Sequence, residues 1–171
     1  MPDTGPAVLF VGNSRGVFRH AVRTALAAEA DLTVHGADWD EYLDPQMVAS
    51  SGVPNDEVGV LYASAGVVLN DHHVDMRRDS FLSNRLFDAA ACGARIATDE
   101  VSGLDETFGA LVQPFADGHD LARLVRPPYT AFPDNETRRE LAKRIVAEHT
   151  FDQRAATLVE DAVTALRARQ R

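Results

Sequence analysis

The sequence predicts an α/β fold, in which a parallel sheet is covered by helices on both faces. Short apolar runs alternate along the chain with segments whose apolar residues recur every three or four positions. Glycines and polar residues gather where the apolar runs end, as they do where a buried strand leads into a helix. Strands and helices that alternate in this way are typical of a parallel sheet, because each helix returns the chain to start the next strand.

Apolar and β-branched runs mark the expected strands. The first of them, AVLFVG, ends in glycine and suits a strand that is buried on both faces. The stretch 37–54 has no clear period and is expected to be mostly loop with one short strand. In chain order, the expected strands are Ala7–Gly12, Leu32–His35, Met47–Ala49, Gly66–Asn70, Ala94–Ala97 and Leu111–Pro114.

Helical spacing and end signals mark the expected helices. Asn55 is expected to cap one helix, with Asp56 and Glu57 in its first turn, and Gly93 is expected to end another. In chain order, the expected helices are Val17–Ala30, Asn55–Ala65, Leu82–Cys92, Gly118–Val125, Asn135–His149 and Asp152–Arg169.

Length and composition indicate one domain over residues 1–171, with a linker at 1–6 and a C-terminal helix at 152–171. The net charge of −9 argues against binding to nucleic acid or to an anionic membrane surface, which require a basic face. Cys92 stands alone, so no intrachain disulfide can form, and a cytoplasmic location is expected. No apolar run approaches the roughly 20 residues of a membrane span.

The first candidate site is the glycine-bracketed segment after the first strand. Free backbone N–H groups at the start of the following helix can hold an anion, and Gly12 and Asn13 lie where it would bind. Arg15 and Arg19 can add positive charge. The G-x-G-x-x-G fingerprint is absent, and a tight turn with solvent-exposed arginines is an equal alternative.

The second candidate is the polar segment after the Gly66–Asn70 strand. His72, His73 and Asp75 resemble a set of metal ligands. Adjacent histidines in an extended segment point to opposite sides, and no further ligand cluster completes the set, so we expect no metal site. Contact between a neutral His72 and a sugar hydroxyl is one alternative, and a purely structural loop is the other.

The third candidate is the start of the helix near Ser83. Asp88 lies four residues after Asn84 and three after Arg85, so the three are expected to share one side. A carboxylate there can accept hydrogen bonds from both ribose hydroxyls, whereas an Arg85–Asp88 surface ion pair is the alternative. The binding residues expected in this segment are Ser80, Phe81, Leu82, Ser83, Asn84, Arg85 and Asp88.

Two blocks of sequence carry a resemblance to a known family. They are YASAGVVLNDH at 62–72 and FLSNRLFDAAACGA at 81–94. Weaker matches are VGNS at 11–14 and HTFDQR at 149–154. Together these blocks resemble the C-terminal domain of group 1 glycosyltransferases, and within them the CgeB-like subgroup.

The resemblance implies one Rossmann-like half of a GT-B fold, the half that binds a nucleoside-diphosphate sugar. Such enzymes retain the anomeric configuration and need neither a metal ion nor a cofactor beyond the donor. By resemblance, the residues from Phe81 to Asn84 would contact the sugar and diphosphate, Asp88 would hold the ribose, and Arg15 and Arg19 would lie nearest the diphosphate. The catalytic residues are not identified in this way.

Two departures from the family pattern affect these expectations. Relatives carry two glutamates separated by seven residues, but counting back from Asp88 places Ser80 at the first, with Asp79 beside it. Either Asp79 substitutes, or this subgroup recognises the sugar differently. No acceptor domain precedes Ala7, so the chain is expected to need a separate N-terminal half, to be inactive alone, and to offer its last helix as an interface.

Two other classes of function remain open. A non-catalytic α/β interaction domain, such as a receiver-like module, would need an acidic pair after the first strand, where Gly12, Asn13 and Ser14 stand instead. Asp71 does occupy the position of a receiver's phosphoacceptor. A nicotinamide-dependent oxidoreductase ranks last, because the glycine fingerprint is missing and Asp38 is the one candidate acid for the ribose.

Overall fold

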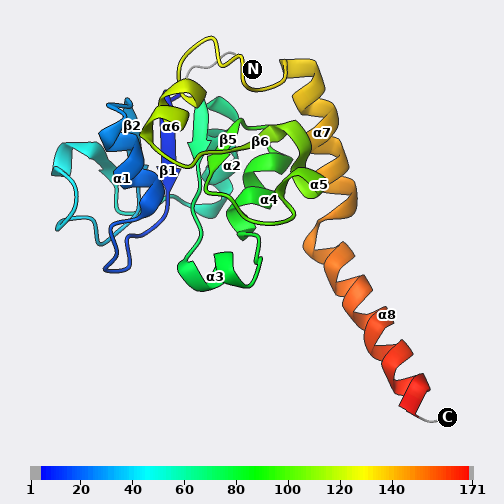
Figure 1. The fold of residues 1–171 in the computed structure, drawn as a ribbon. Helices are drawn as coiled ribbons and strands as arrows, with labels where there is room; N and C mark the ends of the chain where they lie inside the picture. The colour runs from blue at the N-terminus through cyan, green and yellow to red at the C-terminus, as the bar shows by residue number, and fades with distance from the viewer. Residues whose placement is uncertain (1–4, 170–171) are drawn as a thin grey trace.

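A six-stranded parallel sheet forms the centre of the computed structural model, which describes residues 5–169 (Figure 1). Its strand order is β3-β2-β1-β4-β5-β6. Each expected strand is present, with ends that differ by no more than two residues from those expected. The strands are β1 (Val8–Val11), β2 (Leu32–His35), β3 (Val48–Ser50), β4 (Val67–Leu69), β5 (Ile96–Thr98) and β6 (Val112–Pro114).

Helices cover both faces of the sheet, which confirms the predicted fold class. One face packs against α1 and α6, and the other against α2, α4, α5 and α7 (Figure 1). Side chains alternate between the two cores along each strand, with Phe10 in the first and Leu9 in the second. The helices are α1 (His20–Ala27), α2 (Asn55–Ser64), α3 (Val74–Arg78), α4 (Asn84–Ala91), α5 (Leu104–Phe108), α6 (Gly118–Leu124), α7 (Asn135–Glu148) and α8 (Phe151–Arg169).

Several helix boundaries differ from the predictions. The helix expected from Val17 begins at His20, because Arg19 stands at the cap position with a non-helical backbone (φ −54°, ψ 134°). Pro54, and not Asn55, occupies the cap position of α2, which suits a residue without an N–H group. The short helices α3 and α5 were not predicted, since five residues are too few for a helical period to be recognised.

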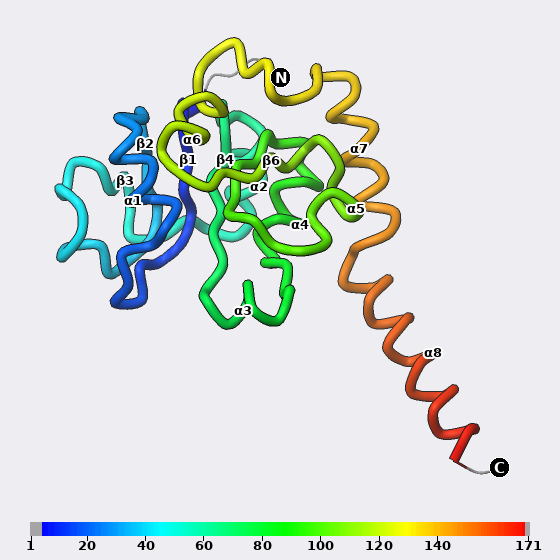
Figure 2. Tube along the Cα trace, in the orientation of Figure 1, coloured from blue at the N-terminus to red at the C-terminus, as the bar shows by residue number. Residues whose placement is uncertain are grey.

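The two ends of the described chain differ in how closely they contact the sheet and its helices. Residues 1–4 of the predicted linker and the last two residues of the C-terminal helix lie outside the described residues. Gly5 and Pro6 are held beside the sheet, where the Gly5 N–H donates to Ser64 O (3.1 Å) and Gly66 donates to Pro6 O (3.0 Å). At the other end, α8 extends away from the body of the molecule (Figure 2).

Candidate functional site

The loops after β1, β4 and β5 meet at the carboxyl edge of the sheet. β1 and β4 are neighbours, but the helices α1 and α4 that follow them cover opposite faces. In open α/β sheets, ligands bind at such a switch point, and we call this edge of the sheet, between the loops after β1 and β4, the crevice. The first and third predicted segments border this crevice, and the second lies in its floor.

A buried ion pair fills the amino end of α1. One oxygen of the Asp71 carboxylate pairs with the Arg19 guanidinium, and the other accepts a hydrogen bond from the Ala21 N–H (3.2 Å). Arg19 also donates to the Asn13 carbonyl oxygen (3.4 Å). The expectation that the start of this helix offers free N–H groups to an anion is therefore wrong, because Asp71 already supplies the negative charge that the helix end attracts.

Hydrogen bonds join the segment after β1 to the segment after β2. The Gly12 N–H donates to His35 O (2.7 Å), and the Trp39 indole N–H donates to Gly12 O (3.0 Å). The Asn13 side-chain oxygen accepts from the Ala37 N–H (2.9 Å), so this amide supports the loop. Arg15, by contrast, is exposed at the tip of the loop, where its side chain is free to turn towards the crevice.

A second hydrogen-bonded chain joins β4, β5 and the start of α4. The Ser83 N–H donates to His72 Nε2 (3.2 Å), so Nε2 is an acceptor and the ring proton lies on Nδ1, which donates to Asp99 Oδ1 (2.7 Å). Both ring nitrogens of His72 are thus occupied. Burial raises the pKa of Asp99, but the hydrogen bonds that it accepts from His72 and Thr98 outweigh burial and leave that pKa below its ordinary value.

Arg85 reaches from the first turn of α4 into the crevice, and its partners there are neutral. Its guanidinium donates to Asn70 Oδ1 (3.2 Å), lies 4.7 Å from the centre of the Phe10 ring and is close to the Tyr62 hydroxyl. The Asn70 amide is oriented by its own bond to Thr98 Oγ1 (2.9 Å). Burial lowers the pKa of Arg85. Within the described residues, Arg85 forms no ion pair, although the charge of Asp71 raises its pKa and opposes the effect of burial.

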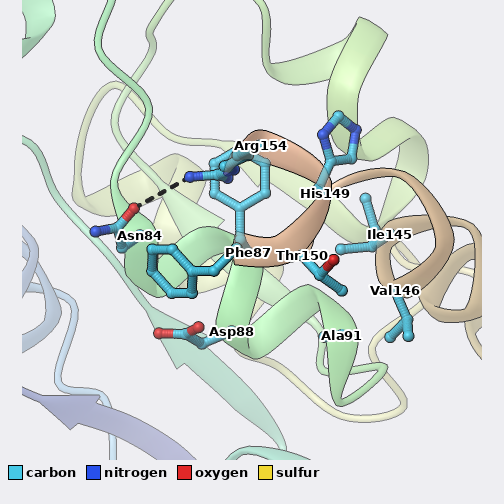
Figure 3. A pocket seen from close by; sticks show the side chains of 10 residues that line it. Asn84, Phe87, Asp88, Ala91, Ile145, Val146, His149, Thr150 and Arg154 are labelled. Atoms are coloured by element: carbon cyan, nitrogen blue, oxygen red, sulfur yellow. Dashed lines mark hydrogen bonds between the residues drawn. The ribbon is translucent and has the colours of Figure 1, made fainter. Parts of the chain in front are cut away.

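Asn84 and Asp88 lie on α4 beside the junction of α7 and α8. Both line a hollow of about 220 Å³ with Arg154 (Figure 3). Asn84 and Asp88 thus share one side, as expected, and the Arg85 charge acts on Asp88, but Arg85 and Asp88 form no ion pair in the described part of the chain. Burial raises the pKa of Asp88, while the positive charges of Arg154 and Arg85 lower it.

The connection between α3 and α4 forms the outer rim of the crevice. Ser80 is exposed and has a left-handed backbone (φ 55°), and Phe81 is exposed beside it. Leu82 is half-buried beside Gly103, where a Cβ atom added to the glycine would lie 3.9 Å from Leu82 Cδ1. Asp79 forms an exposed ion pair with Arg78 (2.8 Å). These rim residues are accessible, as ligand-contacting residues must be, and their role stays a prediction.

Acidic and histidine side chains gather at another place in the fold. Among residues 5–169, Asp117, His119 and Asp120 are the one group of three close enough to share a metal ion. Asp117 accepts from the Asp120 N–H (2.9 Å) and Asp120 accepts from the Ala116 N–H (3.2 Å). Their carboxylates thus support the start of α6, and Gly118 lies beside the carboxyl end of α1, at the opposite edge of the sheet from the crevice.

Several residues of the crevice were not among the predicted binding residues. Asn70, Asp71 and Asp99 orient its arginine and histidine side chains, and Tyr62 contacts Arg85. Asn70, Asp71 and Asp99 share a signal that sequence reading can use, since each follows directly on a buried strand of the sheet. Tyr62 carries no such signal, because α2 has no clear apolar face.

Comparisons with known proteins show which family this chain belongs to. A family model described as glycosyl transferase-like matches residues 15–160. A sucrose-phosphate synthase from Thermosynechococcus elongatus superposes with a TM-score of 0.63 and 21% identity, over 98% of this chain and 47% of that one. A crystal structure titled as the GtfA/B complex superposes with a TM-score of 0.56 and 12% identity, over 94% of this chain and 37% of that one.

The structural matches establish the fold, which is Rossmann-like and corresponds to one half of a GT-B glycosyltransferase. The chain spans less than half the length of the solved chains that it matches. Comparison with curated protein sequences gives no significant match. Among the described helices, none combines the length and the apolar character that crossing a membrane requires.

Proposed function

Because the chain belongs to the glycosyl transferase-like family, we propose that it is the donor-binding domain of a retaining glycosyltransferase. Its ligand is a nucleoside-diphosphate sugar, from which the enzyme transfers a hexose-type sugar to an acceptor. The observation that carries the proposal is the guanidinium of Arg85, which lies at the switch point between β1 and β4 with neutral partners.

The diphosphate is the part of the donor that this arrangement suits best. Arg19 is already neutralised by Asp71, so Arg85 supplies the charge, with Arg15 approaching from the exposed loop. The N–H groups of Asn84 and Arg85 have no acceptor among the described residues, and they stand at the amino end of α4. Positive charge and free donors here stabilise the negative charge that develops on the leaving diphosphate, without a metal ion.

The rest of the donor would extend from the diphosphate along α4. Asp88, one turn further on, accepts the ribose hydroxyls, and the exposed ring of Phe81 contacts the sugar from the rim. His72 contributes indirectly, because both of its ring nitrogens already hold the crevice together. Its task is to fix the Ser83 end of α4 and not to bind the sugar hydroxyl itself.

A second domain supplies the acceptor in this proposal. The described part of α8 buries none of its side chains, and it exposes a series of apolar residues that a partner domain would cover. Leu158, for example, is 71% exposed. The solved structures that the chain matches are more than twice its length, which leaves room for such a domain in the complete enzyme.

Nucleotide binding to an Arg85 variant tests the proposal. We expect UDP, GDP, ADP or dTDP to raise the melting temperature of the wild-type chain without magnesium. Arg85→Gln should weaken binding by about 1.5–3 kcal/mol, the cost of a hydrogen bond to a charged group. Arg23→Gln is the matched control, because Arg23 is an exposed residue of α1. Calorimetric titration measures both changes.

Three outcomes would contradict different parts of the proposal. If none of the four nucleotides binds at millimolar concentration, the donor-binding function is wrong. Equal affinity of the wild type and Arg85→Gln would remove Arg85 from the diphosphate site, and equal affinity of Asp88→Ala would remove Asp88 from the ribose. Sugar transfer by this chain alone would exclude the requirement for a second domain.

A further inference from the structure

Beyond the backbone that joins it to α7, helix α8 meets the body of the protein at Phe151 and Arg154, which line one hollow with residues of α4 and α7. Of its described residues, Arg154 alone is partly buried, and all the others are exposed. The helix begins near the end of α7 and extends away from the rest of the protein (Figures 1 and 2). Whatever orientation α8 takes relative to the rest of the protein is therefore transmitted first through Arg154.

The guanidinium of Arg154 lies on one face of α4. Its carbon atom Cζ is 3.9 Å from the centre of the Phe87 ring, and Nη1 lies 3.5 Å from Asn84 Oδ1 (Figure 3). Phe87 is itself held between the rings of Phe108 (4.8 Å) and His149 (5.4 Å). A planar cation over a confined aromatic ring has a defined position, so this contact is specific to arginine.

The residues that Arg154 contacts belong to the same two turns as the crevice residues of α4. Asn84 precedes Arg85, whose guanidinium donates to Asn70 at the end of β4. Asp88 completes the face towards Arg154 and lines the same hollow. Arg154 therefore contacts the same part of α4 from which Arg85 reaches Asn70.

We infer that Arg154 is a positioning residue, which couples the orientation of α8 to the donor-binding turn of α4. The inference rests on the proposed function. Without a partner on α8, Arg154 holds Asn84, Phe87 and Asp88 in place. This arrangement puts Arg85 at the diphosphate and Asp88 at the ribose. A partner that docks on α8 can thus change donor affinity without touching the donor.

The test compares three full-length variants. Arg154→Ala removes the contact, Arg154→Lys keeps the charge without the planar stacking group, and Arg167→Ala is the control on the exposed end of α8. We expect Arg154→Ala to weaken binding of the nucleoside diphosphate that the wild type binds best by about fivefold, as for an ordinary hydrogen bond. Arg154→Lys should recover part of the loss, and Arg167→Ala should bind as the wild type does.

The pH dependence of binding separates positioning from a general loss of stability. The positive charge of Arg154 lowers the pKa of Asp88, whose ionised form is the ribose acceptor. As the pH falls through that pKa, binding is lost, so Arg154→Ala should lose binding at a higher pH than the wild type. Arg154→Lys should return the midpoint towards the wild-type value. Unchanged affinity and an unchanged midpoint in Arg154→Ala would overturn the inference.

Hydrogen exchange of the free protein keeps this inference separate from the proposed function. The amides of Leu86, Phe87 and Asp88 should exchange faster in Arg154→Ala than in Arg167→Ala. If the wild type binds no nucleotide but this difference appears, the donor assignment fails while the coupling of α8 to α4 stands. If the three amides exchange equally in both variants, Arg154 does not position α4.

Discussion

The Asp71 carboxylate caps α1 from a distant strand end, where Oδ2 accepts a hydrogen bond of 3.2 Å from the Ala21 N–H. The same carboxylate neutralises Arg19. A place at which many α/β proteins bind phosphate is thus occupied by the protein's own anion, and the crevice charge falls to Arg85.

Removing that anion should cost stability and create an anion site. Asp71→Asn leaves the buried Arg19 without its partner, and we expect the free energy of unfolding to fall by about 3 kcal/mol or more in urea titrations. Inorganic phosphate should then raise the melting temperature of the variant more than that of the wild type, because Arg19 and the Ala21 N–H become available.

Two further variants control this prediction. Asp79→Asn breaks an exposed pair with Arg78 and should leave stability almost unchanged, because water screens such pairs. The double variant Arg19→Gln/Asp71→Asn leaves no unpaired charge and should be more stable than Asp71→Asn alone. Phosphate stabilisation that is equal in the wild type and Asp71→Asn would mean that Asp71 does not compete with anions.

Asp99 should make the protein sensitive to acid. Its pKa is lower in the folded protein than in the unfolded chain, so its ionised form contributes stability above the unfolded value. That contribution is lost as the pH falls through the lower, folded value. Asp99→Asn should be less stable at neutral pH by about 1–3 kcal/mol, and its unfolding free energy should vary less with pH below about 4. Urea titrations across the acid range measure both, and parallel pH curves for the two proteins would contradict this role.

Gly36 should tolerate no side chain. An added Cβ would lie against the backbone of Gly12 and 3.0 Å from the Asn13 N atom, and the φ of 150° is unfavourable for other residues. Gly36→Ala should lower stability by about 1–3 kcal/mol, as overpacking does, and weaken nucleotide binding by displacing the loop after β1. Gly52→Ala is the control, because nothing lies within 4 Å of the added atom. Wild-type stability of Gly36→Ala in urea would show that the two loops move apart freely.

Much of the fold could be predicted because it depends on local pattern. Apolar runs were sufficient to place five of the strands, β3 was expected as a short strand within a loop, and Gly93 and the apolar spacing identified α4. The short helices α3 and α5 could not be predicted in this way, since their five residues are held by the chain around them more than by their own periodicity.

The sequence by itself determined that this is an α/β domain, and it identified the segments whose ends line the crevice, because strand burial and helix periodicity are properties of neighbouring residues. Only the tertiary structure decided which charges remain available. Asp71 is 52 positions from Arg19 in the sequence, yet it neutralises that cation. Asp99 is 27 positions from His72 and occupies one nitrogen of its ring, while the Ser83 N–H occupies the other. Arg85 keeps neutral partners for the same reason, since electrostatic pairing depends on distance in space, which the order of residues does not specify.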